Sequence, residues 1–144
     1  MTDKVSKEKR SEVMRLVKSS NTKPEMIVRK FLFANGFRYK LHDKKLAGKP
    51  DLKLTKYKTL IFVNGCFWHG HEVCKSYQMP KSNVDFWNNK IESNKKRDAD
   101  NVNKLRQEGW DVLVIWECDL KAKKRNETLN NLLLYMNNKR HKPL

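Results

Sequence analysis

Two apolar runs separated by a long helical pattern dominate the chain. Residues 59–63 and 110–116 are rich in β-branched and aromatic side chains, which is typical of buried strands. Between them, apolar and small polar residues recur at helical spacing from Val84 to Gln107, and Gly109 then provides a stop signal. The pattern predicts a strand, a helix over about 84–107 and a second strand.

The remaining segments predict further helices and short strands. Thr22-Lys23-Pro24-Glu25 has the form of a capping box with proline in the first turn, so a helix is expected from there to about Ala34. Two further strands are expected at 37–41 and 50–54. Two further helices are expected at 7–18 and 126–139. This order predicts one α/β domain over residues 1–144, with helices flanking a mixed sheet.

The charge balance points to a polyanionic partner. The chain carries 32 Lys and Arg residues against 16 Asp and Glu, a net charge of +16, which favours nucleic acid. The first segment, residues 1–11, is expected to be a basic arm that presents Lys7, Lys9 and Arg10. The sequence has no long apolar segment for a membrane and no apolar core of a signal peptide, so we expect a cytoplasmic protein.

The segment from Cys66 to Cys74 concentrates the ligands that zinc prefers. Cys66, His71 and Cys74 lie on one predicted loop, and Cys118 follows the second apolar run. If the two predicted strands are neighbours, Cys118 lies beside Cys66 and the four side chains form a closed Cys3His site. His69 is a competing ligand, and three unrelated buried cysteines are the alternative interpretation. An odd number of cysteines, three, favours a metal site over disulfides.

Candidate catalytic groups lie on both sides of the first apolar run. Asp51 begins a predicted strand, where nucleases of the restriction type place a carboxylate that holds Mg²⁺. Asp51 could instead be an aspartate that flanks a turn. Glu25 could add a second acidic group, although the capping box already gives it a structural role. His69, if it is free of zinc, could activate water or protonate a leaving oxygen.

An aromatic pair, Phe67 and Trp68, precedes His69 directly. On a loop in a strongly basic protein, such a pair could stack on bases or wedge between them. Filling the hydrophobic core is the alternative role for both rings.

These motifs together are typical of one family. The chain contains Met14-Arg15, Thr22-x-x-Glu25, Gly48-Lys49-Pro50-Asp51, Phe62-Val63-x-Gly65-Cys66-Phe67-Trp68-His69-Gly70-His71, Cys74, Phe86-Trp87, Arg97-Asp98 and Trp116-Glu117-Cys118. From about residue 6 to 120, the chain resembles the very short patch repair (Vsr-type) DNA mismatch endonucleases. The resemblance implies a restriction-endonuclease-like fold of the PD-(D/E)xK type with a structural zinc. It also implies a Mg²⁺-dependent enzyme that nicks one strand 5′ to the T of a T:G mismatch left by deamination of 5-methylcytosine.

The resemblance also implies roles for individual residues. Asp51 would be the main Mg²⁺ ligand together with the main-chain carbonyl of Val63, while Glu25 and His69 would hold or activate water. The zinc ligands would be Cys66, His71, Cys74 and Cys118. The wedge that opens the duplex would consist of Met14, Phe67 and Trp68, and the basic arm would clamp the DNA. The resemblance further implies a monomer that is associated with the bacterial nucleoid when it is bound to DNA. Its implied partners are mismatched double-stranded DNA, other repair proteins and an associated cytosine methyltransferase.

One position departs from the family. After Phe62-Val63 the family carries a histidine implicated in catalysis, whereas this chain has Asn64. An asparagine can hydrogen-bond a phosphate but cannot supply a proton at neutral pH. A slow enzyme, a protein that binds without cleaving and an altered sequence are all compatible with Asn64. The alternative functions are therefore a sequence-specific endonuclease that needs no mismatch and a zinc-containing DNA-binding protein with impaired cleavage.

Overall fold

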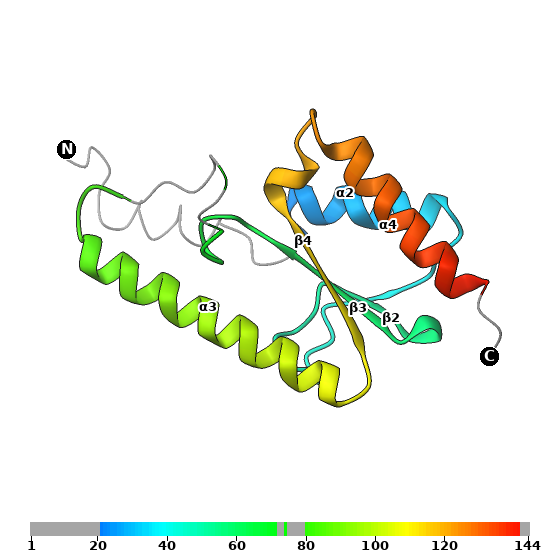
Figure 1. Cartoon of the computed structure of the whole chain (residues 1–144), viewed down its shortest axis with the longest axis horizontal. Coiled ribbons are helices and arrows are strands. Elements are labelled where there is room, and N and C mark those ends of the chain that lie inside the picture. Colours follow the sequence, from blue (N-terminus) through cyan, green and yellow to red (C-terminus); the bar gives the residue numbers. More distant parts are fainter. Residues whose placement is uncertain (1–20, 72–73, 75–79, 142–144) are drawn as a thin grey trace.

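A four-stranded mixed sheet forms the centre of the protein (Figure 1). The structure is a computed structural model, and it describes residues 21–71, 74 and 80–141. The strands lie in the order β1 (Lys40–Leu41), β2 (Leu52–Leu54), β3 (Thr59–Asn64) and β4 (Asp111–Trp116). β2 pairs antiparallel with both β1 and β3, while β3 and β4 pair in parallel. The predicted mixed sheet is therefore confirmed.

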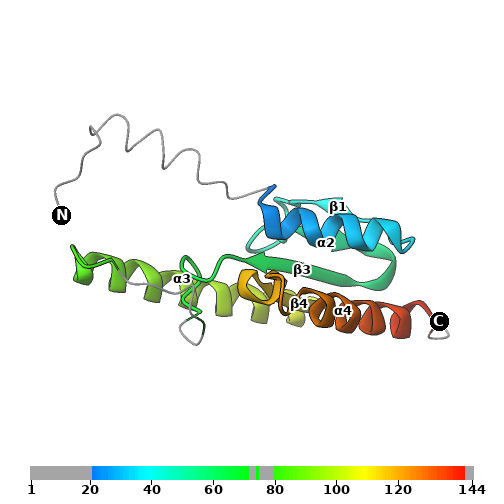
Figure 2. The same ribbon diagram turned by 90° about the horizontal axis from the view of Figure 1, so that it is seen from above.

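Helices cover both faces of this sheet (Figures 1 and 2). α2 (Lys23–Ala34) and α4 (Arg125–Arg140) lie together on one face, and α3 (Val84–Gln107) lies on the other. Two short 3₁₀ helices, η1 (Thr55–Tyr57) and η2 (Glu117–Leu120), follow β2 and β4. The predicted bounds of α3 are confirmed, and α4 is longer than expected by one residue at each end. Within the described ranges, no helix is both long and apolar enough to cross a membrane.

The residues of β3 and β4 alternate between the two helical layers. Leu60 and Val112 pack with Leu105 of α3 on one face. Ile61 and Ile115 point to the opposite face and join the buried side chains of α2 and α4. Because successive strand residues point to opposite faces, a strand covered on both sides needs apolar residues at every position. Cover on both faces explains why apolar residues follow one another without a break from Leu60 to Val63 and from Val112 to Trp116.

The N-terminal half of α3 extends past the sheet, towards the loop that follows β3 (Figure 1). The two buried residues of α3 are Leu105, in the core, and Ile91, which lies beside Gly70 of that loop. A Cβ atom added to Gly70 would come within 2.9 Å of Ile91 and 2.5 Å of Lys95. Gly70 also has a φ of +68°, so both the backbone conformation and the close approach require glycine where the loop meets the helix.

The predicted strand at 37–41 is wrong in its first part, because only its last two residues pair with β2. Phe37 instead closes the end of α2 by donating its N–H to the carbonyl oxygen of Leu32 at 3.0 Å. Its buried ring packs edge-on against Tyr57, with 5.7 Å between ring centroids. β2 also begins later than predicted, at Leu52 rather than Pro50, and a proline has no N–H to donate to a neighbouring strand.

The predicted capping box at the start of α2 is only partly formed. The Thr22 hydroxyl accepts a hydrogen bond from the N–H of Glu25 at 3.4 Å. The return bond comes from the N–H of Asn21, at 3.0 Å from Glu25 Oε1, instead of from Thr22 itself. The predicted helix at 7–18 and the basic arm at 1–11 lie outside the described residues.

Candidate functional site

Asp51 lies at the start of β2, beside the second half of β3. The antiparallel register pairs Leu52 with Ile61, so Asp51 comes next to the residues that follow Ile61. Its Oδ2 accepts a hydrogen bond from the main-chain N–H of Val63 at 2.7 Å. Burial raises the pKa of Asp51 from 3.8 to about 6; the hydrogen bond from Val63 opposes the rise, and the negative charge of Glu25 adds to it.

Glu25 reaches the same place from the first turn of α2. Its side chain is 1% exposed, and Arg29, one turn later, contacts its Oε2 at 3.2 Å. Glu25, His42 and Asp51 each place one ligand atom within 4.8 Å of the others. A buried and a half-buried carboxylate that repel each other, together with one nitrogen atom, fit a divalent cation, because the cation would remove the repulsion.

His42 completes this cluster, although no sequence motif pointed to it. Its Nε2 lies 3.0 Å from each carboxylate oxygen of Glu25 and 3.8 Å from Oδ1 of Asp51. The reason is the register of β1 with β2: Leu41 pairs with Leu52, so the next residue lies opposite Asp51. The N–H of His42 accordingly donates to the Asp51 carbonyl oxygen at 3.2 Å. A strand pairing would have revealed this histidine, but the hydrophobic pattern alone does not define the pairing.

A groove of about 860 Å³ opens beside Asp51. Its walls include Asp51, Val63, Asn64 and His69, so residues from β2, β3 and the following loop share one space. Glu25 lies behind this wall, against Asp51, and does not line the groove. The structure therefore brings together the side chains that the sequence singled out for catalysis, while their chemical roles stay predictions.

The imidazole of His69 is held by α3. Its Nδ1 lies 2.6 Å from Oδ2 of Asp98. Such a contact fixes the orientation of the ring and leaves Nε2 as the nitrogen for proton exchange. Asp98 had no predicted role, but it occurs among the apolar positions of the helical pattern, on the face that turns towards the loop. A single charge on such a face was the available signal.

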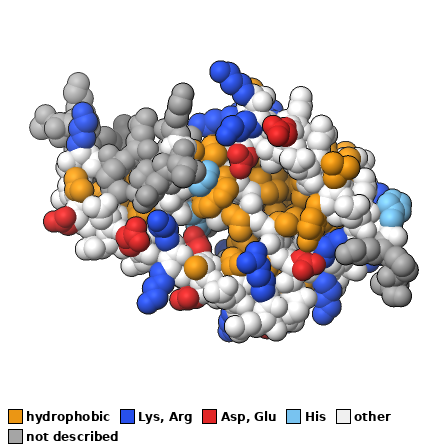
Figure 3. Space-filling model, viewed as in Figure 1, with side chains coloured by type: hydrophobic (Ala, Val, Ile, Leu, Met, Phe, Trp, Pro, Cys, Tyr) orange, Lys and Arg blue, Asp and Glu red, His pale blue; other side chains and the backbone are white. Residues whose placement is uncertain are grey.

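Asn64 forms part of the buried wall of the groove. It is the last residue of β3, lies opposite Trp116 of β4 and is 7% exposed. A second cavity of about 510 Å³, between α3 and the sheet, is lined by Asn64 and His69 together with apolar side chains such as Phe62 and Val114. Figure 3 shows apolar side chains gathered on this face, between α3 and the layer of α2 and α4. Asn64 and His69 therefore line both the groove and the second cavity.

Phe67 and Trp68 line the groove but belong to neither buried core cluster of the described chain. Their rings lie edge-to-face at 5.3 Å, and both pack against Trp87 of α3, at 5.5 and 5.7 Å. Both side chains are half-buried. Both rings pack on the part of α3 that extends past the sheet, and this position is compatible with contact between the rings and DNA bases. That contact stays a prediction.

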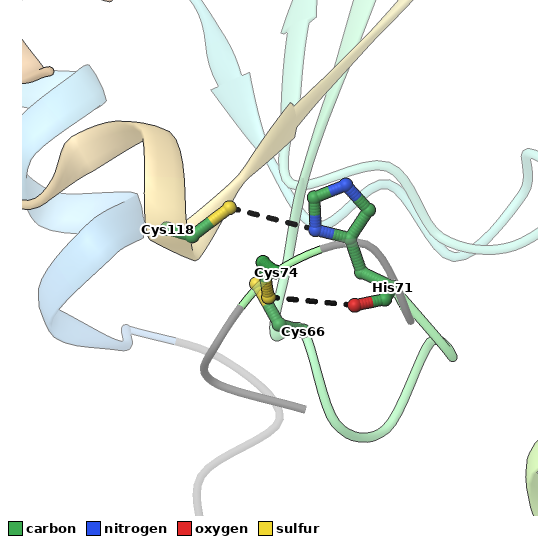
Figure 4. Close-up of side chains that lie close together, drawn as sticks. All are labelled: Cys66, His71, Cys74 and Cys118. Carbon is green, nitrogen blue, oxygen red and sulfur yellow. Dashed lines mark hydrogen bonds between the residues drawn. The ribbon is translucent and has the colours of Figure 1, made fainter. Parts of the chain in front are cut away.

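Three thiols and an imidazole converge beyond the ends of β3 and β4 (Figure 4). The parallel register places Asn64 opposite Trp116, and Cys66 and Cys118 each follow two residues later. One ligand atom from each member lies within 4.8 Å of the others, the members being Cys66, His71, Cys74 and Cys118. The predicted pairing of the two strands, which brings Cys118 to Cys66, is confirmed.

His71, and not His69, faces the thiols. Its Nδ1 lies 3.5 Å from Sγ of Cys118. Tetrahedral zinc with ordinary bond lengths separates nitrogen and sulfur ligands by about 3.6 Å. The ring of His71 also stacks on Trp116, with 4.1 Å between centroids and an interplanar angle of 5°. The side chain is therefore fixed in a suitable orientation for a shared cation.

The chemistry of this cluster fits zinc. Burial raises the pKa of Cys66 to about 12, and burial also raises the pKa of Cys118. Thiols at these positions are costly to ionise unless a cation compensates the charge, and zinc binds thiolates. A closed set of four protein ligands without a position for water is typical of structural zinc sites.

The predicted DNA contacts at Lys7, Lys9, Arg10 and Met14 lie outside the described residues. They stay predictions.

The chain is similar in sequence to known proteins. The family model described as DNA mismatch endonuclease Vsr matches residues 2–75. The type II nicking enzyme V.NmeAIP of Neisseria meningitidis serogroup A is 52% identical over 134 residues, which cover 92% of this chain and 95% of the relative. The type II nicking enzyme V.XorIIP of Xanthomonas oryzae pv. oryzae is 47% identical over 120 residues, covering 83% and 88%. The DNA mismatch endonuclease Vsr of Escherichia coli K12 is 34% identical over 125 residues, covering 87% and 80%.

The buried charge of Asp51 makes stability depend on pH. Its pKa is higher in the folded than in the unfolded chain, so its contribution to stability is fully present below about pH 4 and is lost as the pH rises through about 6. Without added divalent cation, Asp51→Asn should raise the free energy of unfolding at pH 7.5 by about 1–3 kcal/mol, and by little at pH 4. Urea denaturation over this pH range measures the difference.

The matched control is Asp43→Asn. A hydrogen bond from Lys53 lowers the pKa of Asp43, so its ionised form stabilises the fold and the substitution should act in the opposite direction at pH 7.5. An Asp51→Asn protein that is no more stable than the unchanged chain at pH 7.5 would contradict the cost of this buried charge.

Proposed function

The chain belongs to the family of Vsr DNA mismatch endonucleases, and from this premise we propose that it nicks one strand of DNA 5′ to the T of a T:G mismatch. The observation that carries the proposal is the shared groove of Asp51 and His69, next to an aromatic pair and a thiol cluster. Such T:G pairs arise when 5-methylcytosine is deaminated, so the nick would initiate very short patch repair. The names of the two type II nicking enzymes support strand nicking, and the name of the more distant relative, the DNA mismatch endonuclease of Escherichia coli, supports action at a mismatch.

Asp51 is the proposed anchor of a catalytic Mg²⁺, together with the main-chain carbonyl of Val63. The bound cation would supply charge neutralisation at the scissile phosphate and orientation of the attacking water. Glu25, held by Arg29, positions that water from the side of α2. Because both carboxylates are preorganised by hydrogen bonds, they need little rearrangement at the moment of reaction.

His69 is the proposed group for proton transfer. With Nδ1 bound to Asp98, its Nε2 exchanges a proton with the attacking water or with the leaving oxygen. Asp98 keeps the ring in one orientation, as a carboxylate does for other catalytic histidines. Asn64, on the same wall, hydrogen-bonds the phosphate without exchanging a proton. The lack of proton exchange at Asn64 would make the nicking rate lower than that of a chain with histidine at position 64.

Binding to mismatched duplex is proposed to combine charge and stacking. The net charge of +16 and the arm with Lys7, Lys9 and Arg10 would neutralise phosphates. Met14, Phe67 and Trp68 would wedge into the stack beside the weak T:G pair. The protein would act as a monomer, alongside an associated cytosine methyltransferase and further repair proteins.

Zinc is proposed as a structural ion. Its four ligands would tie the loop after β3 to the end of β4. That loop carries Phe67, Trp68 and His69, so fixing it would also fix the groove.

The central experiment measures nicking of a duplex library that contains one T:G pair within randomised flanks, against matched T:A and C:G duplexes, with Mg²⁺. We expect cleavage of the T strand alone, abolished by Asp51→Asn with binding retained. His69→Ala should be nearly as damaging because it removes the proton-transfer group. Asn64→His should raise the rate by about one to three orders of magnitude, the scale of one acid–base group.

Each alternative has its own outcome in this experiment. Equal rates for the unchanged chain and Asn64→His would show that position 64 takes no part in proton transfer. Cleavage that ignores the mismatch would favour a sequence-specific endonuclease. Specific binding without cleavage by either protein would favour a DNA-binding function, for which the buried Asn64 is the supporting observation.

Loss of the zinc site should destabilise the protein. Cys118→Ser and His71→Ala should each reduce the bound zinc from one ion per chain and lower the free energy of unfolding by at least about 3 kcal/mol, because metal binding contributes to folding. Elemental analysis and thermal unfolding measure both effects. His69→Ala is the control and should keep its zinc. Folded protein that contains no zinc would refute the proposal.

The aromatic pair should serve recognition more than stability. Phe67→Ala combined with Trp68→Ala should leave the fold intact but reduce the preference for T:G over T:A duplexes, since unstacking costs roughly a few kcal/mol per step. The matched control is Phe37→Ala, which removes a fully buried ring and should cost about 3–5 kcal/mol of stability. If the double variant is as unstable as this control, the two rings belong to the core.

A further inference from the structure

His42 lies between the two carboxylates of the proposed cation site, and the proposed function gives it no task. We propose that His42 is a nitrogen ligand of the catalytic divalent cation, so that Glu25, His42 and Asp51 form one mixed ligand set. The inference rests on the proposed function in taking Asp51 as a cation ligand, and it differs from that function in making Glu25 a direct ligand of the cation and no longer only a holder of water. It changes the class of the site from all-oxygen to oxygen and nitrogen.

The separations suit a shared cation. Neighbouring ligands in octahedral geometry, with bonds of about 2.1 Å, lie about 3.0 Å apart. Nε2 of His42 lies 3.0 Å from Oε1 of Glu25, and 3.8 Å from Oδ1 of Asp51. All three ligand atoms lie within 4.8 Å of one another. Asp51 would need to move only slightly to bind a cation held by Glu25 and His42.

Each of the two carboxylates is also held by a contact that does not involve the other two side chains. Asp51 is bound through its other oxygen to the N–H of Val63. Glu25 is bound by Arg29 and by the N–H of Asn21. The three side chains come from β2, from α2 and from the residue after β1. Such separate support is typical of a preorganised metal site, in which outer partners orient the ligands.

The backbone of His42 gives an independent reason. It has a φ of +48°, in the left-handed region that residues other than glycine rarely adopt. The main-chain N–H of His42 donates a hydrogen bond to the carbonyl oxygen of Asp51 at 3.2 Å, and this bond holds the residue in that conformation. Residues held in such conformations cluster at functional sites, where the surrounding structure compensates the strain. Here the conformation occurs at the residue whose imidazole contacts both carboxylates.

A nitrogen ligand changes which ions bind well. Carboxylate and carbonyl oxygens suit Mg²⁺, Ca²⁺ and Mn²⁺ alike, whereas imidazole suits transition metals, so an added imidazole strengthens the binding of the transition metal Mn²⁺ more than that of Mg²⁺. The ligand set therefore predicts that Mn²⁺ binds more tightly than Mg²⁺, and that the margin depends on His42.

The test titrates the full chain, with its zinc retained and without DNA, with MnCl₂. Electron paramagnetic resonance counts free Mn²⁺, and electron spin echo modulation detects a directly bound ¹⁴N atom. We expect one bound Mn²⁺ with nitrogen modulation. His42→Gln, which offers an oxygen at similar reach, should lose the modulation and weaken Mn²⁺ binding at least about tenfold, with a smaller loss for Mg²⁺ measured by competition.

Three further variants make the result specific. His42→Asn tolerates the left-handed backbone but is too short to reach the cation, so it separates ligation from folding. His69→Ala should keep the nitrogen modulation, because this nearby imidazole is bound to Asp98. Asp51→Asn should weaken Mn²⁺ binding, which shows that the ion occupies this site. Circular dichroism confirms that each variant is folded.

The inference is overturned if the unchanged chain shows no nitrogen modulation, if the modulation survives His42→Gln, or if neither His42 variant weakens Mn²⁺ binding. Restored Mn²⁺ affinity in His42→Gln would also overturn it and would indicate a hydrogen-bonding role in positioning Glu25. These readouts need no cleavage. A chain that binds Mn²⁺ through His42 but never nicks DNA would refute the proposed function and leave this ligand assignment intact.

Discussion

The parallel pairing of β3 with β4 is the constraint on which the rest of the structure depends. It sets Asn64 opposite Trp116 and thereby brings the residues that follow both strands into one place. The thiol cluster closes there, and the N–H of Cys66 donates to Oε1 of Glu117 at 3.2 Å. A parallel pair needs a crossover connection, and α3 provides it. The same helix then supplies partners for the loop after β3: Asn94 donates to the Trp68 carbonyl oxygen at 2.9 Å. One pairing therefore assembles both the cluster and a wall of the groove.

Much of this arrangement follows from the sequence, because burial on both faces leaves a clear pattern. The two apolar runs and the long helix between them correspond to β3, β4 and α3, and the assumption that the strands are neighbours led directly to Cys118. The segment at 37–41 misled the prediction because aromatic residues can alternate in burial without pairing. His42 escaped notice for a related reason: its position depends on the register of two very short strands, which no local signal specifies. For Asp98 the sequence carried a local signal, a single charge among the apolar positions of α3, but not the identity of its partner, His69.

The two candidate metal sites have different kinds of ligand, although they lie close together in the chain. The cluster of Glu25, His42 and Asp51 combines two carboxylates with one imidazole and fits a harder cation, whereas the other cluster combines three thiols with one imidazole and fits a softer one. Val63 contacts Asp51, and Cys66 begins the thiol cluster only three residues later. Neither ligand set contains a thiol and a carboxylate together. Because the ligand types are separated in this way, each site can select its own ion even though the two sites lie close together.

The order in which these parts leave the ribosome has a consequence for biogenesis. His71 and Cys118 are 47 residues apart in the chain, with the whole of α3 between them. During synthesis, Cys66, His71 and Cys74 emerge long before Cys118, so the four side chains of the cluster cannot come together until β4 has been made and has paired with β3. Contacts this distant in sequence form late and slowly in folding. The wall of the groove that depends on the same pairing therefore forms only after β4 has been made.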